Sequence, residues 1–206
     1  MTNLFESNNN KKREEPLAYR MRPKSLDEIY GQDEIMGKNK ILRKAIESDQ
    51  IQSLILYGPP GTGKTSIASV IAENTDSDFK VLNAVTSGVS DIRDVIKEAK
   101  DKKDLYNTKT ILFIDEIHRF NKAQQDALLP AVEKGIIIMI GATTENPYFE
   151  VNSPLLSRSR IFQLEPLNKE NIIKIINDAL NSEKGLKDHN IKIDDKTINF
   201  IAEIAD

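Results

Sequence analysis

Cysteine and tryptophan are absent from this sequence of 206 residues, and only two histidines are present. A chain without cysteine forms neither disulfides nor thiolate-bound zinc sites, so both of these protein classes are excluded. The two histidines, His118 and His189, are far apart in sequence and cannot form a metal site by themselves. This composition fits a reducing compartment, and we expect a cytoplasmic protein.

Long hydrophobic runs are missing as well. The longest, Ile136 to Ile140, is far shorter than the ~20 apolar residues of a membrane-spanning helix. The N-terminus lacks the hydrophobic segment of a secretion signal. We therefore expect neither a membrane protein nor a secreted one.

A large excess of positive charge is also missing, because the net charge is −3. A strongly basic nucleic-acid-binding protein is excluded, so any DNA contact must come from a local patch or from assembly. Hydrophobic residues make up 39% of the chain and charged residues 30%, which allows a packed core. The length corresponds to one domain, or to one domain and part of a second.

The order of apolar patterns predicts the fold class. Residues 1–15 are polar and low in complexity, and we expect a disordered tail there. Five short, nearly continuous apolar runs follow, as is typical of strands buried on both faces of a parallel sheet. These runs are 54–57, 80–83, 111–114, 136–140 and 161–164. Helical patterns lie between them, which predicts an α/β domain with a parallel sheet over residues 16–166.

Helices are predicted between these strands, one of them over residues 66–72, and a different pattern follows them. Apolar residues at helical spacing over 92–99 predict one helix, with Ser90 as its cap. Residues 121–133 predict another, bent at Pro130. From Asn168 onward only helical patterns occur, so residues 167–206 are predicted to begin a small all-α domain. Its stripe of isoleucine and leucine, which includes Ile172, is interpreted as core, with a groove for a partner as the alternative.

The strongest chemical signal is a glycine-rich loop between a predicted strand and a predicted helix. Its residues are Gly58, Pro59, Pro60, Gly61, Thr62, Gly63, Lys64 and Thr65, and Ser66 follows. This spacing is that of the phosphate-binding P-loop, whose backbone N–H groups and helix N-terminus bind phosphates. We expect Lys64 to contact the β- and γ-phosphates and the Thr65 hydroxyl to ligate Mg²⁺. The alternative is a turn that matches by chance, but the flanking strand and helix favour the P-loop.

A pair of carboxylates ends another predicted strand. Asp115 and Glu116 directly follow the apolar run 111–114. Ligand sites of open α/β sheets lie at the carboxyl ends of strands, so we expect Asp115 to hold Mg²⁺ and Glu116 to orient and polarise the attacking water. The alternative is an acidic cap of the next helix. Together the loop and the pair predict an enzyme that hydrolyses ATP with Mg²⁺.

Further stretches of the sequence carry a family resemblance. They are residues 16–23, 26–32, 58–65, 115–126, 141–147 and 155–160. With them the chain resembles the AAA+ ATPases, and more narrowly the RarA/MgsA replication-associated recombination proteins and their relatives, the Werner-helicase-interacting ATPases. The runs His118–Lys122 and Ala142–Pro147 are the most specific. Clamp-loader subunits and the Holliday-junction motor share the layout but differ in these runs.

The resemblance implies a P-loop NTPase (AAA+) three-layer fold, followed by the start of a helical lid, and it assigns further site residues. Residues 19–31 are implied to form a wall for adenine and ribose, with Ile29 and Tyr30 contacting the base. The alternative is an N-terminal arm packed on the core. Thr144 matches the family's first sensor, which hydrogen-bonds the γ-phosphate or the attacking water. Asn83 is a candidate to hold Glu116 in an inactive orientation.

Two more residues receive roles from the resemblance. Arg158 resembles the arginine finger, a catalytic residue that reaches the ATP site of a neighbouring subunit. Arg160 is the runner-up, and the alternative is two exposed arginines in a solvated turn. His118 is interpreted as a polar residue near the site or at a subunit interface.

The resemblance also implies the biological role. It suggests a DNA-dependent ATPase of replication-fork maintenance, recombination and repair, which remodels DNA ends or DNA-bound proteins as a homo-oligomer, with single-strand-binding or other replication proteins as partners. The alternatives are a clamp-loader or branch-migration subunit and, in another class, an ATP-binding interaction module with little turnover. The family's second-sensor arginine and C-terminal assembly region have no counterpart in these residues, so we expect a longer protein.

Overall fold

The computed structural model describes residues 15–205. These residues divide into two compact units, one formed by 24–166 and the other by 15–23 together with 167–205. The division falls after Pro166. Residues 16–23, which were expected to belong with the sheet, group with the helical segment. The predicted tail, residues 1–15, lies almost entirely outside the described residues.

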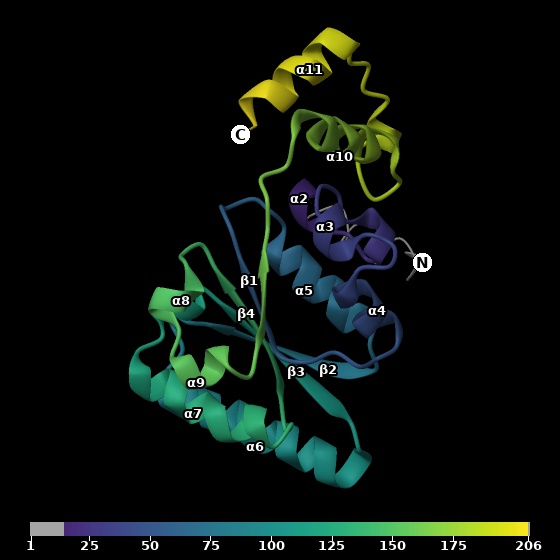
Figure 1. Ribbon diagram of the computed structural model, residues 1–206. Helices are drawn as coiled ribbons and strands as arrows, with labels where there is room; N and C mark the ends of the chain where they lie inside the picture. Colours follow the sequence, from purple (N-terminus) through teal and green to yellow (C-terminus); the bar gives the residue numbers. More distant parts are fainter. Residues whose placement is uncertain (1–14, 206) are drawn as a thin grey trace. The chain divides into compact units, whose positions relative to one another are not determined.

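The larger unit is built on one five-stranded parallel sheet (Figure 1). Its strands are β1 (Leu54–Tyr57), β2 (Ser77–Asn83), β3 (Lys109–Asp115), β4 (Ile138–Thr143) and β5 (Arg160–Gln163). Their order is β2-β3-β4-β1-β5, and every neighbouring pair is parallel. The predicted parallel α/β sheet is confirmed, and β4 lies between the strands that carry the P-loop and the acidic pair.

Two predictions about the strands were wrong. The apolar run at 136–140 was expected to form a strand, but β4 begins at Ile138. The N–H groups of Ile136 and Ile137 donate instead to Ala131 O and close the end of the preceding helix. Strand β2 was expected to be buried on both faces, but it is an edge strand on which Val81 is 58% exposed.

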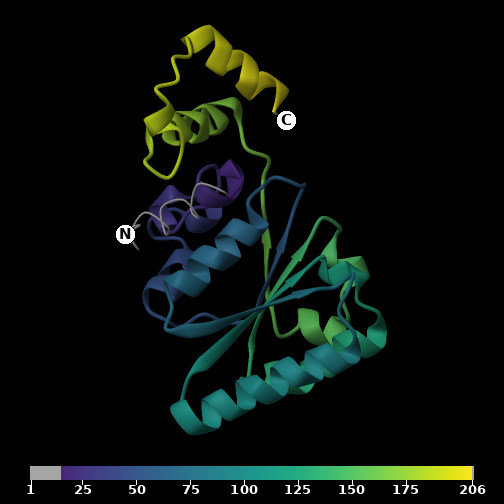
Figure 2. The ribbon, with the colours of Figure 1, turned by 180° about the vertical axis from the view of Figure 1, so that it is seen from behind.

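Helices cover both faces of the sheet (Figures 1 and 2). On one face α4 (Ile41–Glu47) and α5 (Lys64–Glu73) pack through Leu42, Ile46 and Ile67 onto Leu54 and Leu56 of β1. On the other, α6 (Val89–Tyr106) and α7 (Lys122–Glu133, containing Pro130) enclose a second cluster with Ile55. Consecutive residues of β1 point to opposite faces, as in any strand, so the predicted three-layer fold is confirmed.

The start of α6 differs from the prediction. Gly88, and not Ser90, is the N-cap residue, and its N–H donates to Asp91 Oδ2 at 2.7 Å. Ser90 lies in the first turn because the chain enters the helix two residues earlier than expected. Short helices fill other connections of this unit, namely η1 (Leu26–Glu28), α3 (Asp33–Met36), η2 (Ile117–Arg119), α8 (Pro147–Glu150) and α9 (Ser153–Leu156).

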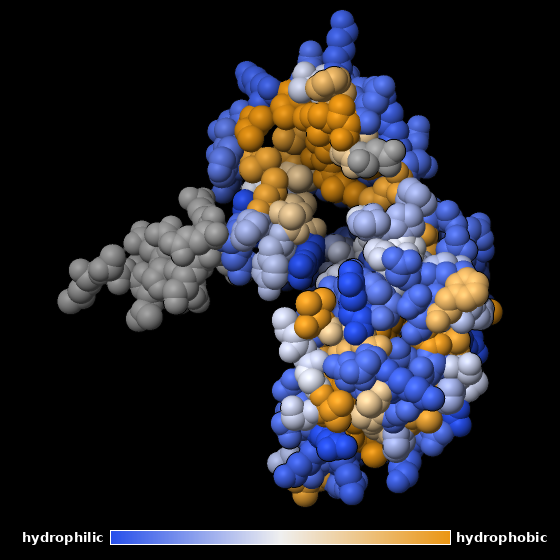
Figure 3. All heavy atoms as spheres, turned by 90° about the vertical axis from the view of Figure 1, so that its left-hand side faces the viewer, coloured by the Kyte–Doolittle hydropathy of each residue, from blue (hydrophilic) through white to orange (hydrophobic). Residues whose placement is uncertain are grey.

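The smaller unit is helical, as predicted. It contains α2 (Leu17–Arg20), α10 (Lys169–Asn181), η3 (Lys187–His189) and α11 (Asp195–Ile204). Arg20 Nη1 donates to Lys184 O at 2.7 Å and Gly185 O at 3.2 Å, which ties α2 to the segment after α10. Apolar side chains gather on the surface of this unit (Figure 3), where Phe200 and Ile204 are exposed. Within residues 15–205, no helix is both long and apolar enough to cross a membrane.

Candidate nucleotide-binding site

Three adjacent strands end at the same edge of the sheet and bring the predicted site together. The P-loop follows β1, Asp115 is the last residue of β3, and Thr143 is the last residue of β4. Since β3, β4 and β1 are parallel neighbours, the segments after them meet at their carboxyl ends. The Gly58 N–H donates to Thr143 O at 3.2 Å and joins the P-loop to β4 directly.

The backbone of the P-loop is turned by glycines with positive φ. These angles are 156° at Gly58, 78° at Gly61 and 92° at Gly63, which is also the N-cap of α5. A Cβ at Gly58 would lie 2.4 Å from Leu164 O, so only glycine fits there. Thr62 is buried, and its hydroxyl donates to Pro59 O at 3.0 Å, which closes the loop on itself.

Lys64 is the cation of the site. Its side chain is buried, and Nζ donates to Gly58 O at 2.7 Å and Pro59 O at 2.8 Å. Burial lowers the pKa of the Lys64 ammonium, while the charges of Glu116 and Asp115 act in the opposite direction. The sheet order agrees with this, because α5 follows β1 and the two carboxylates end and follow β3 at the same edge of the sheet. Bonded to carbonyls alone, the ammonium can exchange these partners for the stronger acceptors of a phosphate.

The residues predicted to hold Mg²⁺ fit that ion. Thr65 and Ser66 lie in the first turn of α5, after the loop. Within residues 15–205, neither the Thr65 hydroxyl nor the Asp115 carboxylate has a hydrogen-bond or ion-pair partner, so both have oxygens available for a ligand. Mg²⁺ takes one or two protein oxygens and completes its shell with water and phosphate. Accordingly, the described residues contain no cluster of three or more acidic or histidine ligands.

Glu116 has an unusual backbone and a specific partner. Its φ of 55° and ψ of 46° are left-handed, a conformation that costs a non-glycine residue about 1–3 kcal/mol and is found at functional sites. Its Oε2 lies 3.2 Å from His118 Nδ1. Asn83, the residue expected to hold Glu116, instead accepts a hydrogen bond from the Val85 N–H at 2.9 Å. The structure thus gives Glu116 a partner that sequence reasoning missed.

The two threonines at the end of β4 differ in their surroundings. Thr143 is completely buried, and its Oγ1 lies 2.9 Å from His118 Nδ1 and accepts from the Glu145 N–H at 3.0 Å. Thr144, the predicted sensor, is the next residue and is partly exposed. Its hydroxyl has no partner within residues 15–205. Thr144 is therefore the threonine that is available to a ligand, while Thr143 belongs to the supporting structure.

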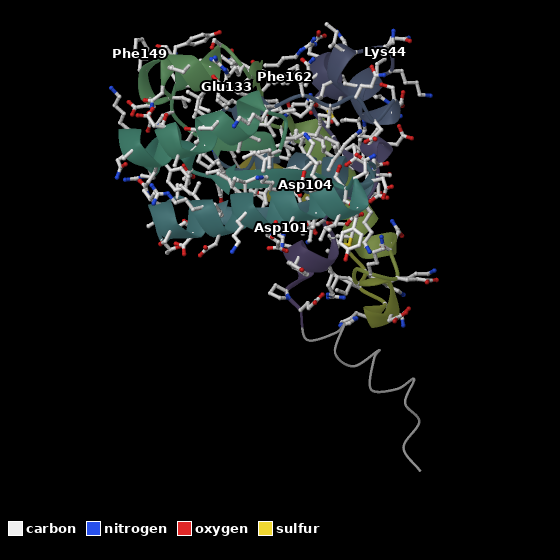
Figure 4. All side chains as sticks on the ribbon, turned by 90° about the horizontal axis from the view of Figure 1, so that it is seen from below. Lys44, Asp101, Asp104, Glu133, Phe149 and Phe162 are labelled. Carbon is white, nitrogen blue, oxygen red and sulfur yellow. The ribbon has the colours of Figure 1, made fainter. Side chains whose placement is uncertain are left out.

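The candidate arginine finger, Arg158, lies at the side of the sheet where the strands begin, opposite the side that carries the P-loop. Arg158 precedes β5, and the Arg160 N–H donates to Ser53 O just before β1, at 2.9 Å. Parallel strands start at the edge opposite the one where they end, so Arg158 is separated from the P-loop of its own chain by the length of β1. Arg158 Nη2 forms an ion pair with Glu133 Oε1 at 2.6 Å. Glu133, labelled in Figure 4, is the last residue of α7.

Residues 29–32 contribute a contact that the sequence did not reveal. Ile29, one of the two predicted adenine contacts beside Tyr30, packs partly buried against the core that includes α5. Gln32 is buried, and its Nε2 donates to Thr62 O in the P-loop at 3.3 Å and to Glu165 O at 2.8 Å. Its Oε1 accepts from the Glu165 N–H at 3.2 Å. The only signal in the sequence is a glutamine directly after a glycine, which is too common to single it out.

This sheet order, the P-loop after β1 and the acidic pair after β3 define a P-loop ATPase domain. Residues 54–167 match the family described as "ATPase family associated with various cellular activities (AAA)", which covers more than half of the chain. The chain belongs to this family.

Its relatives are more specific. The chain is 47% identical over 192 residues to Replication-associated recombination protein A of Escherichia coli K12, covering 93% of this chain and 43% of that protein. It is 48% identical over 202 residues to "ATPase WRNIP1" of Dictyostelium discoideum, covering 98% of this chain and 23% of that protein. The chain thus spans less than half the length of these relatives. The resemblance to the replication-associated recombination proteins is confirmed.

Solved structures agree with the fold. The Thermotoga maritima RuvB Holliday junction branch migration motor superimposes with a TM-score of 0.70 at 30% identity, covering 89% of this chain and 59% of that chain. The expected AAA+ fold is therefore present in both sequence and structure.

Proposed function

We propose that this chain binds Mg·ATP at the P-loop and hydrolyses it, as the ATPase core of a replication-associated recombination protein. The observation that carries the proposal is the buried Lys64 ammonium, which is held by loop carbonyls at the edge of the sheet where Asp115 and Glu116 also lie. A cation between a phosphate-binding loop and two carboxylates has the chemistry of phosphoryl transfer.

Each site residue then has a role. The loop N–H groups and Lys64 hold the phosphates. Ser66 contributes to the same site from the first turn of α5. Thr65 and Asp115 hold Mg²⁺, which, when bound, neutralises charge on the β- and γ-phosphates.

Other residues contact the attacking water and the adenine of ATP. Glu116 orients the attacking water and accepts its proton. Thr144 hydrogen-bonds the γ-phosphate or that water. Ile29 and Tyr30 lie in the segment that contacts adenine.

We infer a homo-oligomer with Arg158 acting in trans, and the position of that residue supports this proposal. The P-loop ATP site needs a cation for the charge that develops on the transferred phosphoryl group. Arg158 lies at the edge of the sheet opposite its own P-loop, and the site of a neighbouring copy is the one that it can serve. Arg160, which is also exposed, is the alternative donor.

The proposed process is replication-fork maintenance with recombination and repair, because the relatives are named for replication-associated recombination. The substrates proposed are DNA forks, single strands or ends, with single-strand-binding or other replication proteins as partners. A net charge of −3 means that DNA contact comes from a local patch or from assembly rather than from a uniformly basic surface. The location proposed is the cytoplasm, in association with the nucleoid.

One experiment separates this function from its rivals. ATP turnover is measured with forked DNA, single-stranded DNA, a four-way junction and a sliding clamp. Stimulation by forks or single strands supports the proposal. Stimulation by the four-way junction alone favours a branch-migration motor, which the likeness to RuvB makes the second candidate. Stimulation by the clamp alone favours a clamp loader, and ATP binding without turnover would leave only an interaction module.

A further inference from the structure

His118 is a buried imidazole beside the candidate base, and the proposed mechanism gives it no role. Its side chain is 10% exposed, whereas that of Glu116 is 35% exposed. One ring nitrogen, Nδ1, lies 3.2 Å from Glu116 Oε2 and 2.9 Å from Thr143 Oγ1. A single ring atom therefore contacts both the candidate base and the last residue of β4.

The hydrogen-bonding capacity of these atoms decides which tautomer fits. A carboxylate oxygen has lone pairs but no proton, so its short contact with Nδ1 is attractive only if Nδ1 carries the proton. The Thr143 hydroxyl can accept from the same N–H while it also accepts from the Glu145 N–H. If Nδ1 were unprotonated, its lone pair would face the lone pairs of Glu116 Oε2, which is repulsive. The Nδ1–H tautomer is the one that satisfies all these atoms.

We propose that His118 is a positioning residue for Glu116: its Nδ1–H, fixed by the buried Thr143, anchors Oε2 and leaves Oε1 to take the proton of the attacking water. The inference rests on the proposed role of Glu116 as the base. It follows the general arrangement in which a catalytic base is itself oriented by a third group. The left-handed backbone of Glu116 is a second sign that the direction of this carboxylate is imposed by its surroundings.

The same contacts connect the base to the sensor. Thr143 immediately precedes Thr144, and its main-chain oxygen accepts from the Gly58 N–H of the P-loop. His118 Nδ1 therefore contacts both the base and the residue next to the proposed sensor.

The first test is spectroscopic and does not depend on turnover. Because the chain has only two histidines, ring ¹H–¹⁵N spectra contain two sets of signals, and His189, which is exposed, serves as an internal reference. At mildly alkaline pH, where an imidazole is neutral, we expect the Nδ1–H tautomer for His118. We expect Glu116→Ala and Thr143→Val each to shift it toward the Nε2–H form. An Nε2–H tautomer in the unsubstituted protein would overturn the inference.

The second test uses matched substitutions in steady-state ATP hydrolysis. His118→Leu removes the donor, and we expect kcat to fall about 10- to 100-fold with the KM for ATP within about twofold. His118→Asn places an amide N–H where Nδ1 lies, and it should restore kcat to within about fivefold of the original value. His118→Gln carries the same amide one carbon further out and should stay near the Leu variant. Equal kcat for the Leu and unsubstituted proteins, or for the Asn and Leu variants, contradicts the inference.

The failure of this inference is distinguishable from failure of the proposed function. If His118 shows the expected tautomer while Glu116→Gln hydrolyses ATP normally, the contact exists but Glu116 is not the base. If Glu116→Gln loses turnover while His118→Leu keeps it, the ATPase mechanism stands and the positioning role of His118 is wrong.

Discussion

Arg158 Nη2 and Glu133 Oε1 lie 2.6 Å apart, in an ion pair between the segment before β5 and the end of α7. The Arg158 guanidinium also donates to Pro154 O and Ser157 Oγ, both at 2.9 Å. An arginine that acts on a neighbouring ATP site must give up the pair with Glu133. Both side chains are about two-fifths exposed, so the pair contributes only about 0.2–1 kcal/mol.

The first prediction concerns this pair. Glu133→Gln should release Arg158 and lower the protein concentration that gives half-maximal ATPase activity by about two- to fivefold, the equivalent of that ion pair. The measurement is ATP turnover as a function of protein concentration. Glu34→Gln, which breaks a surface pair with Lys40, is the matched control and should leave the curve unchanged. A rise in the required concentration would show that Glu133 supports assembly instead.

The second prediction concerns Arg158 itself. Arg158→Ala should lower kcat by about 10³-fold or more and leave ATP affinity unchanged, because an arginine finger stabilises charge only in the transition state. Arg160→Ala is the comparison, and a larger loss there would make Arg160 the finger. Mixing Arg158→Ala subunits with Glu116→Gln subunits should restore part of the activity, since one interface then has both an intact base and an intact arginine. Without any restoration, action in trans is not supported.

The third prediction separates binding from chemistry within the site. Lys64→Ala should weaken ATP binding about 10- to 100-fold, since charge-assisted hydrogen bonds to phosphate are lost. Glu116→Gln should bind ATP as the original chain does but hydrolyse it about 100-fold or more slowly. Fluorescent-nucleotide titration and single-turnover hydrolysis measure the two effects. Normal binding by the Lys64 variant would contradict its assignment to the phosphates.

The fourth prediction uses two glycines of the same loop. Gly58→Ala should cost more stability than Gly61→Ala, because the new Cβ at residue 58 would lie 2.4 Å from Leu164 O, whereas nothing lies within 4 Å of a Cβ at Gly61. At Gly61 only the backbone angle is unfavourable, at about 1–2 kcal/mol. Denaturant unfolding of both variants measures the difference. Equal losses of stability would mean that the chain around Leu164 moves away from the new Cβ at no cost in free energy.

The fifth prediction is a pH dependence of stability. Hydrogen bonds from Lys80 and then Lys102 lower the pKa of Glu98 on α6 from 4.5 to about 2. A carboxylate with a depressed pKa stabilises the fold above its ordinary pKa and loses this contribution as the pH falls toward the folded-state value. Glu98→Gln should therefore lower the denaturant midpoint at neutral pH, with the difference from the original chain vanishing between about pH 4.5 and 2.

The matched control for Glu98 is on the same helix. Asp101, labelled in Figure 4, is an exposed carboxylate that makes no ion pair within the described residues. Asp101→Asn should leave the midpoint unchanged at neutral pH. If both variants behave alike, the ion pairs of Glu98 do not contribute to stability.

The sequence was sufficient for those features that depend on local pattern. The P-loop and the acidic pair are contiguous runs after apolar segments, and the sheet places both at one edge, as the rule for parallel strands requires. We did not predict that β2 is an edge strand, because the residues of one strand do not indicate which strands pair with it. The start of β4 was missed because the N–H groups of Ile136 and Ile137 pair with the preceding helix, an outcome that apolar character does not predict.

His118 was expected near the site, but its contacts, like those of Gln32, were missed for a related reason. His118 and Thr143 are 25 residues apart, and their contact exists only because β3 and β4 are neighbours. Gln32 reaches Glu165 across 133 positions of the sequence. A single sequence contains no record of such pairs, whereas the structure shows them as individual hydrogen bonds.

Gln32 has a mechanical consequence for the larger unit. Its amide connects Thr62, two residues before Lys64, with Glu165, directly before the Pro166 at which the chain leaves this unit. A single neutral side chain therefore holds the main chain of the P-loop and the last residues of the larger unit in one hydrogen-bonded group.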